Sequence, residues 1–271
     1  LLGGADQVPP VDGLEPSAFK NVTTYKMTQI VRQDEDNPIR ELCTLLRNDV
    51  ANNTFTFLNY ISTHKSKFDS TMTKGFMVCN SAEFQRQVEL QFSDEAITKN
   101  TDYVKVVAYT NMAVSAWNKF IRETIIKDSE KSVITKNDLI TSYITLVNEF
   151  KETIIRNSED YIVRDIANYT HPKYDIKGFM VKFQAVHGGQ VTSPLFVLDH
   201  RDAYSIKRYC QICNELIEQA KNANKQVRAA KWKKYFEFRE SCLILINIAK
   251  ADGTVLHYRN LDYGFSVTAH K

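Results

Sequence analysis

Two short apolar segments, each followed at once by an amphipathic helix pattern, constrain the fold of this chain more than any other feature. They are residues 75–79 (GFMVC) and 104–109 (VKVVAY). Asn80 and Glu83 resemble a capping box after the first, and Thr110-Asn111 cap the helix after the second. Strands that alternate with helices predict an α/β domain with a mostly parallel sheet, covered on both faces.

Two helices have clear starts and clear buried faces. Asn37 is a good N-cap and Pro38 takes the tolerated first helical position. Apolar residues then recur at helical spacing, first as Ile39, Leu42, Cys43 and Leu46, and behind Thr110 as Val114, Trp117, Ile121 and Ile125. With only nine glycines and six prolines in 271 residues, interruptions are few, so we expect long helices and a sizeable core.

The middle of the chain has the pattern of a small antiparallel β module. Residues 161–166 and 179–186 alternate with a period of two, Gly188-Gly189 suit a hairpin turn, and residues 195–198 supply another strand. A long, largely uninterrupted helical stretch is then predicted from Ala203 to about Arg239. The simplest topology is therefore an all-β insertion inside an α/β domain.

The end of the chain returns to buried strands, at residues 243–248 and at residues 265–268, where the last strand would close the sheet. The chain begins at Leu1 rather than Met and stops just after this strand. We therefore expect both ends to be cut, and the chain to be an interior segment of a longer protein.

Composition excludes several classes of protein. With 43% apolar and 25% charged residues, the chain is neither disordered nor fibrous, and a net charge of +3 is too small to name a partner. No membrane span and no signal peptide are expected, so we predict a soluble, cytoplasmic protein.

Five scattered cysteines argue for a reducing compartment. Cys210 and Cys213 lack the second pair of a zinc site, so we expect them to be buried structural residues and predict no metal site.

Two common nucleotide-binding patterns are missing. Neither the P-loop string G-x-x-x-x-G-K-[ST] nor the dinucleotide fingerprint G-x-G-x-x-G occurs in the 271 residues. These residues alone therefore cannot cradle the phosphates of a nucleotide.

Four short strings, in a fixed order, carry a family resemblance. Residues 4–11 (GADQVPPV), 27–33 (MTQIVRQ), 107–111 (VAYTN, followed by Val114, Asn118 and Ile121-Arg122) and 263–271 (YGFSVTAHK) resemble consecutive motifs of superfamily 1 helicases, from the third to the start of the fifth. They are most similar to the RecD and phage Dda branch, which moves 5′ to 3′ along single-stranded DNA. One departure is Gly4, where the family has Asp.

The resemblance implies a fold and a domain organisation. The fold would be α/β, a RecA-like (P-loop NTPase-type) parallel sheet domain interrupted by a small SH3-like β-barrel and helices. Residues 1–20 would end a first RecA-like domain, and the second would fill the rest of residues 1–135. Residues 136–240 would form the inserted β-barrel and helical subdomain, and residues 241–271 would return to the second RecA-like domain.

The resemblance also assigns three residues to the nucleotide. Arg32 would be the arginine finger on the γ-phosphate, because a guanidinium fork suits an oxyanion better than the point charge of a lysine. Gln7 would sense the γ-phosphate, and Gln33 would bind the nucleotide beside them. Taken alone, Arg32 could equally pair with Asp34 or Glu35, and Gln7 could be a turn residue. ATP and Mg²⁺ would be bound mainly by the first RecA-like domain. The 271 residues are therefore not expected to hydrolyse ATP alone.

Five residues at strand ends are candidates for DNA binding. Small hydroxyl, amide and basic groups there can hold backbone phosphates without reading bases, and they are Thr110, Asn111, Thr268, His270 and Lys271. A plain helix N-cap is the alternative for Thr110 and Asn111, and the two roles are compatible because a helix N-terminus binds phosphate. His270 could instead be merely a terminal residue.

A basic cluster surrounds Trp232 and consists of Lys221, Lys225, Arg228, Lys231, Lys233, Lys234 and Arg239. It could add affinity for DNA, or it could be a solvated helix face.

The sequence therefore predicts part of an ATP-dependent 5′ to 3′ DNA helicase that translocates on single-stranded DNA. Its partners would be single-stranded DNA, the DNA fork, ATP and replication or recombination proteins, with no membrane contact, in the nucleoid of a bacterial or phage-infected cell. A Pif-type helicase or the RecD subunit of a recombination nuclease would share these motifs. From another class, a catalytically inactive, helicase-derived module could bind single-stranded DNA or a replication partner.

Overall fold

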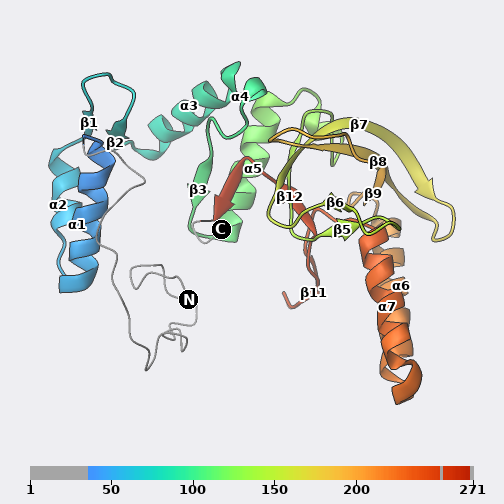
Figure 1. Cartoon of the computed structure of the whole chain (residues 1–271). Coiled ribbons are helices and arrows are strands. Elements are labelled where there is room, and N and C mark those ends of the chain that lie inside the picture. The colour runs from blue at the N-terminus through green and yellow to red at the C-terminus, as the bar shows by residue number, and fades with distance from the viewer. Residues whose placement is uncertain (1–35, 251–252, 269–271) are drawn as a thin grey trace. The chain divides into compact units, whose positions relative to one another are not determined.

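The computed structural model describes residues 36–250 and 253–268 (Figure 1). They divide into two compact units, one ending at Gln87 and the other beginning at Val88, and each is described by itself. The protein is a mixed α/β structure in which the small sheets are mostly antiparallel. Within the described ranges, no helix is long and apolar enough to cross a bilayer.

The first unit contains two helices and a short hairpin. Helix α1 (Pro38–Asn52) is followed by α2 (Thr56–Thr63), by the antiparallel strands β1 (Ser66–Phe68) and β2 (Gly75–Met77), and by the start of α3 (Ser81–Phe92). The predicted cap of α1 is confirmed, because Asn37 Oδ1 accepts the N–H of Ile39 at 3.0 Å. Asp49 joins the two helices, since its carboxylate accepts the N–H groups of Thr56 and Phe57.

The strand predicted at residues 75–79 exists but has a different partner from the one expected. It pairs with β1 in an antiparallel hairpin and not in a parallel sheet. Asp69 closes the turn of this hairpin, since its Oδ1 accepts the N–H groups of Thr73 and Lys74 at 2.9 and 3.0 Å. A local side-chain turn therefore decided the pairing, and the strand-helix alternation alone did not reveal it.

The second unit holds the larger set of elements. The end of α3 leads to α4 (Ala96–Lys99), β3 (Val106–Ala108), α5 (Asn111–Ile125), a 3-10 turn (Ser129–Lys131), β4 (Leu139–Ser142), β5 (Leu146–Val147), β6 (Thr153–Ile155), β7 (Asp160–His171), β8 (Ile176–Ala185), β9 (Leu195–Leu198), α6 (Ala203–Lys221), α7 (Lys225–Ser241), β10 (Ile248–Ala249), β11 (Val255–His257), β12 (Leu261–Tyr263) and β13 (Ser266–Thr268).

The main sheet of this unit is antiparallel, with strand order β12-β4-β7-β8-β9. The long β7–β8 hairpin dominates it (Figure 1), and the predicted glycine pair lies in the connection to β9, where Gly188 and Gly189 have φ of +95° and +123°. The expected parallel sheet is represented, among the described strands, by the pair β3–β13 alone. The antiparallel module predicted at residues 161–166, 179–186 and 195–198 is confirmed as β7, β8 and β9, since hairpin connections favour antiparallel neighbours.

No closed barrel is formed by the strands in the described ranges. The two edge strands of the main sheet, β9 and β12, are instead linked through residues 243–244. The N–H of Leu243 donates to Phe196 O at 3.0 Å, and Ile244 O accepts the N–H of Leu261 at 3.1 Å. The buried strand predicted at residues 243–248 is thus mostly a buried bridging segment, with regular strand geometry only in β10.

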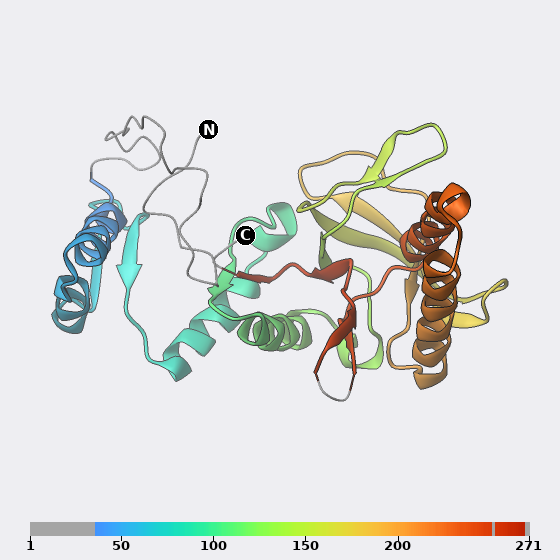
Figure 2. The ribbon, with the colours of Figure 1, turned by 90° about the horizontal axis from the view of Figure 1, so that it is seen from below.

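The helical stretch predicted from Ala203 to about Arg239 is confirmed, as two helices with a short break between them. Helix α6 ends at Lys221 and α7 begins at Lys225, and the two lie side by side in both ribbon views (Figures 1 and 2). Asn224 starts α7 by accepting the N–H of Val227 at 3.2 Å. Neither glycine nor proline marks the break at residues 222–224, so the sequence predicted the helical stretch but not the place where it is interrupted.

Three hydrophobic clusters hold the second unit together. The first fills the antiparallel sheet around Ile140, Val163 and Phe183. The second lies between this sheet and helices α6 and α7, and the third lies under α5 and β3, where Trp117 is half-buried as part of the predicted apolar stripe. The β3–α5 unit is therefore packed against the antiparallel sheet as well, because this cluster includes Leu139 of β4.

One buried histidine predicts a pH dependence of stability. His257 is 2% exposed, and neither ring nitrogen has a partner among the described residues. Burial, with the nearby Arg239 charge, lowers the pKa of His257 from 6.5 to about 4. Between these values the unfolded chain holds a proton that the folded chain does not, so stability falls as pH drops through this window. Because of His257, we expect the free energy of unfolding to fall by about 2 kcal/mol when the pH is lowered from about 7 to about 5.

Urea unfolding followed by circular dichroism at the two pH values checks this expectation. His257→Phe removes the titrating ring and keeps an aromatic group against Tyr209, whose ring centroid lies 5.6 Å from that of His257. The variant should lose less stability than the wild type on acidification. Equal losses in the two proteins would show that other groups carry the effect.

Candidate functional site

Two segments that lie far apart in the sequence meet as parallel strands. The register pairs Val106 with Ser266, Val107 with Val267 and Ala108 with Thr268. The predicted strands at residues 104–109 and 265–268 are therefore confirmed as β3 and β13, and the structure adds that they pair with each other (Figure 1). Because parallel strands end at the same edge, Thr110 and Asn111 after β3 are brought to the same end as Thr268.

The N-terminus of α5 lies at this edge. Thr110 is the N-cap, as predicted: its backbone is extended, with φ −109° and ψ 149°, and its Oγ1 accepts the N–H of Ala113 at 3.1 Å. Its carbonyl accepts the N–H of Val114 at 3.0 Å. The N–H groups of Asn111 and Met112 have no acceptor within the described part of the chain, as is usual for the first turn of a helix.

The edge is open to solvent. Thr110 and Asn111 are exposed and Thr268 is half-buried. Two apolar side chains flank them, with Tyr109 78% exposed and Met112 82% exposed. The edge thus combines hydroxyl groups, an amide, helix N–H groups and an aromatic ring, without a fixed charge on any of these residues.

A buried amide connects α5 to the strand that carries Thr268. Asn118 is 1% exposed, and its Nδ2 donates to Tyr263 O at 2.8 Å. Its Oδ1 accepts the N–H of Ser266 at 2.6 Å, and Nδ2 also approaches Ser266 O at 3.4 Å. In the sequence, Asn118 is named only as part of a motif, and this structural role was not predicted. The sequence feature that could have indicated it is an uncharged polar residue beside an apolar stripe.

Arg122 uses its guanidinium inside the protein. Its Nε and Nη2 donate to the two carboxylate oxygens of Asp138 at 2.7 and 2.9 Å, and it also donates to Ser129 O at 2.9 Å and Ser132 O at 3.0 Å. The guanidinium carbon lies 4.9 Å from the ring centroid of Tyr263. Although Arg122 belongs to a motif, it holds α5 to the next loop and is not available to a phosphate.

Gly264 allows the chain to pass closely between its neighbours just before β13. Its N–H donates to Leu139 O at 2.8 Å, and its carbonyl accepts from Lys105 Nζ at 2.5 Å. A Cβ at this position would lie 2.9 Å from Thr141 Oγ1 and 3.1 Å from Leu139 Cγ. Together with Asn118, this close passage sets the direction in which β13 runs toward the edge.

The basic cluster lies apart from this edge, because α7 is distant from β3 and β13 in both ribbon views (Figures 1 and 2). Several of its charges already have protein partners. Arg239 Nη2 donates to Tyr258 O at 2.6 Å, Lys221 pairs with Glu218 at 3.5 Å, and Lys233 pairs with Glu237 at 3.7 Å. The structure does not bring the cluster into the candidate site.

Two cysteines lie on α6, and the expected burial is confirmed for one of them. Cys213 is fully buried, Cys210 is half-buried, and both are free thiols. Burial raises the pKa of both thiols, to about 12 for Cys213. Because the thiolate is the reactive form, these cysteines do not provide a nucleophile at neutral pH.

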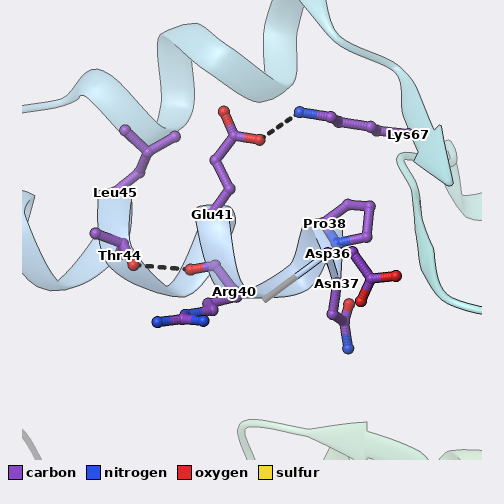
Figure 3. A pocket seen from close by; sticks show the side chains of 8 residues that line it. All are labelled: Asp36, Asn37, Pro38, Arg40, Glu41, Thr44, Leu45 and Lys67. Atoms are coloured by element: carbon purple, nitrogen blue, oxygen red, sulfur yellow. Dashed lines mark hydrogen bonds and ion pairs between the residues drawn. The ribbon is translucent and has the colours of Figure 1, made fainter. Parts of the chain in front are cut away.

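A shallow hollow at the start of α1 follows closely after the Arg32-Gln33 segment in the chain (Figure 3). It is lined by Asp36, Asn37, Pro38, Arg40, Glu41, Thr44, Leu45 and Lys67. Lys67 Nζ donates to Glu41 Oε2 at 2.6 Å. Since two acidic and two basic side chains line it, the hollow has no electrostatic preference for an anion.

The remaining predicted site residues are Gln7, Arg32, Gln33, His270 and Lys271, and all five lie outside the described residues. Of the DNA-binding candidates, the structure thus brings together Thr110, Asn111 and Thr268. Comparison with models of known protein families and with curated proteins finds no match for the chain.

Proposed function

We propose that the chain is part of an ATP-dependent DNA helicase that moves along single-stranded DNA. The observation that carries the proposal is the parallel pairing of β3 with β13. These strands belong to the two described segments that resemble helicase motifs, and their pairing sets Thr110 and Asn111 at the same edge as Thr268. The 5′ to 3′ direction of movement along DNA is also proposed, and it rests on the sequence resemblance alone.

The chemistry of the edge suits a sugar-phosphate backbone. Hydroxyl, amide and backbone N–H groups donate hydrogen bonds to phosphate oxygens, and the N-terminus of α5 adds the positive end of a helix dipole. None of these groups reads the identity of a base. Such a site can hold any sequence and release it, which translocation requires.

The finer fold that we propose is a RecA-like domain interrupted by an SH3-like barrel. The antiparallel sheet and helices α6 and α7 lie in sequence between the two strands of the parallel pair, as an insertion would. The hydrogen bonds of residues 243–244 to both edge strands support a barrel-like closure of that sheet.

ATP and Mg²⁺ are proposed to bind between this domain and a further RecA-like domain that supplies the P-loop. Arg32 and Gln7 would contact the γ-phosphate, with Gln33 beside them. Closing and opening of the cleft would move single-stranded DNA across both domains. Action at a fork with replication or recombination proteins, in the cytoplasm and at the nucleoid, belongs to the same proposal.

Thr110→Asp tests the DNA site. Aspartate is as good an N-cap as threonine, so α5 should remain folded, but its charge would face the bound phosphates. We expect the affinity of the 271-residue chain for a fluorescein-labelled oligothymidine, measured by anisotropy at low salt, to fall about tenfold or more.

Asn37→Asp is the matched control, because it makes the same neutral-to-acidic exchange at the N-cap of α1. It should bind the oligothymidine like the wild type. Wild-type affinity in Thr110→Asp, or equal losses in the two variants, would contradict the proposed site.

A further inference from the structure

We propose that the exposed face of α7 is a dimer interface, on which the same helix of a second copy of this chain lies antiparallel. The contact joins α7 to α7 about a two-fold axis. The inference goes beyond the proposed function and does not depend on it, because α7 lies apart from the Thr110–Thr268 edge (Figures 1 and 2).

An apolar hollow lies along this face of α7. Tyr235 and Phe238 are buried on the side of the helix that packs in the second hydrophobic cluster. On the other side Phe236 is 54% exposed, and its ring centroid lies 6.3 Å from that of Trp232. The hollow has a volume of about 540 Å³ and is lined by Ala229, Trp232, Lys233, Phe236, Glu237 and Glu240, all from α7. The helix thus buries one side and leaves aromatic surface in solvent on the other.

The two ends of this face carry opposite charges. Five residues follow one another at intervals of three or four positions, so they share one face of the helix: Lys225, Ala229, Trp232, Phe236 and Glu240. Lys225 and Glu240 are both exposed. The face therefore begins with a positive charge, continues with apolar side chains and ends with a negative charge.

A second α7 that runs in the antiparallel direction complements this pattern. With the two-fold axis through the middle of the hollow, Lys225 of each copy lies opposite Glu240 of the other, and Ala229 lies opposite Phe236. The small side chain leaves room for the large ring, and both contacts occur twice, as in any isologous interface. A parallel arrangement would instead set lysine against lysine and glutamate against glutamate.

A second copy suits this face better than a nucleic acid or an acidic peptide. Two of the three charged residues that line the hollow are glutamates, Glu237 and Glu240, and they repel phosphate and carboxylate groups alike. The third, Lys233, already pairs with Glu237 at 3.7 Å. The hollow is therefore not basic, although α7 is basic overall. A complementary partner carries a negative charge at one end and a positive charge at the other, as α7 itself does.

Sedimentation velocity of the 271-residue chain over a range of concentrations tests the interface. One helix from each copy makes a small contact, so we expect a weak dimer with a dissociation constant of about 10 to 100 µM. Glu240→Lys and Lys225→Glu each set like charges opposite one another, and each should weaken association about tenfold or more. Both variants should keep α7 folded, because glutamate in the first turn and lysine in the last turn suit the helix dipole.

Charge exchange between copies gives a sharper readout. An equimolar mixture of the two single variants should associate about as strongly as the wild type, because every glutamate then lies opposite a lysine. The double variant Lys225→Glu/Glu240→Lys should recover association for the same reason. Glu215→Lys is the matched control, since Glu215 is exposed on α6, and it should associate like the wild type.

Four outcomes would overturn the inference. The first is a wild-type chain that stays monomeric up to about 1 mM. The second is a dimer that resists both single charge reversals, which would place the contact elsewhere. The third is a failure of both the mixture and the double variant to recover, which would exclude the pairing of Lys225 with Glu240. The fourth is association that requires added oligothymidine, which would assign the face to nucleic acid.

Discussion

Arg122→Met is expected to lower the free energy of unfolding by about 3 to 5 kcal/mol, the usual effect of breaking a buried ion pair from one side. The side chain of Arg122 is 7% exposed and that of Asp138 is fully buried. The substitution leaves the Asp138 carboxylate without its bidentate partner and Ser132 O without its donor, and Ser129 O keeps the long contact from Arg201 Nη2 at 3.5 Å. Methionine fills a similar volume, so the loss reports hydrogen bonds and charge more than packing.

Urea unfolding at neutral pH measures this loss. Arg164→Met is the matched control, because Arg164 donates to Gln184 Oε1 at 2.7 Å on the exposed face of the sheet. It should change stability by no more than about 1 kcal/mol. Arg122→Lys should fall between the two, since lysine keeps the charge but cannot form the fork. A loss below about 1 kcal/mol for Arg122→Met would falsify the view that this pair is a main support of α5.

Asn118→Leu is the second large effect that we expect, at about 2 to 4 kcal/mol of unfolding free energy. Leucine has a similar shape, but it leaves the N–H of Ser266 and the carbonyl of Tyr263 buried without their partner. Each orphaned buried group costs about 1 to 3 kcal/mol. Because these bonds hold β13 to α5, DNA binding at the Thr110–Thr268 edge should weaken in molecules that remain folded.

Lys119→Leu is the control for Asn118→Leu on the same helix. Its side chain is 76% exposed and its ion pair with Glu123 is long, at 3.9 Å. It should leave both urea unfolding and oligothymidine binding close to the wild type. Wild-type stability in Asn118→Leu would show that water or a backbone shift replaces the amide, and that Asn118 does not position β13.

Local features were predictable because their causes lie within a few residues. The N-caps Asn37 and Thr110 were identified from side chains that bond two or three residues ahead. The apolar stripe of α5 followed from its helical period. The break between α6 and α7 was missed, because asparagine caps at residues 222–224 end and start helices without the glycine or proline that usually marks such a break.

The candidate site was predictable only in part. Thr110, Asn111 and Thr268 were named from the sequence, but the role of Asn118 was not. Its three bonds reach a backbone segment far along the chain, and nothing near Asn118 in sequence specifies them. Likewise, the close passage at Gly264 depends on Leu139 and Thr141, which belong to another strand.

The sequence by itself determined where strands and helices begin around the site, because capping and hydrophobic period act over one or two turns. Only the tertiary structure decided that β3 and β13 are parallel partners and that β4 and β12 extend the predicted antiparallel module. Such pairings join distant residues, and their loop-closure cost is repaid only by the summed burial of whole elements. This burial brings Thr110 and Thr268 to one edge of the sheet. No local sequence pattern predicts it.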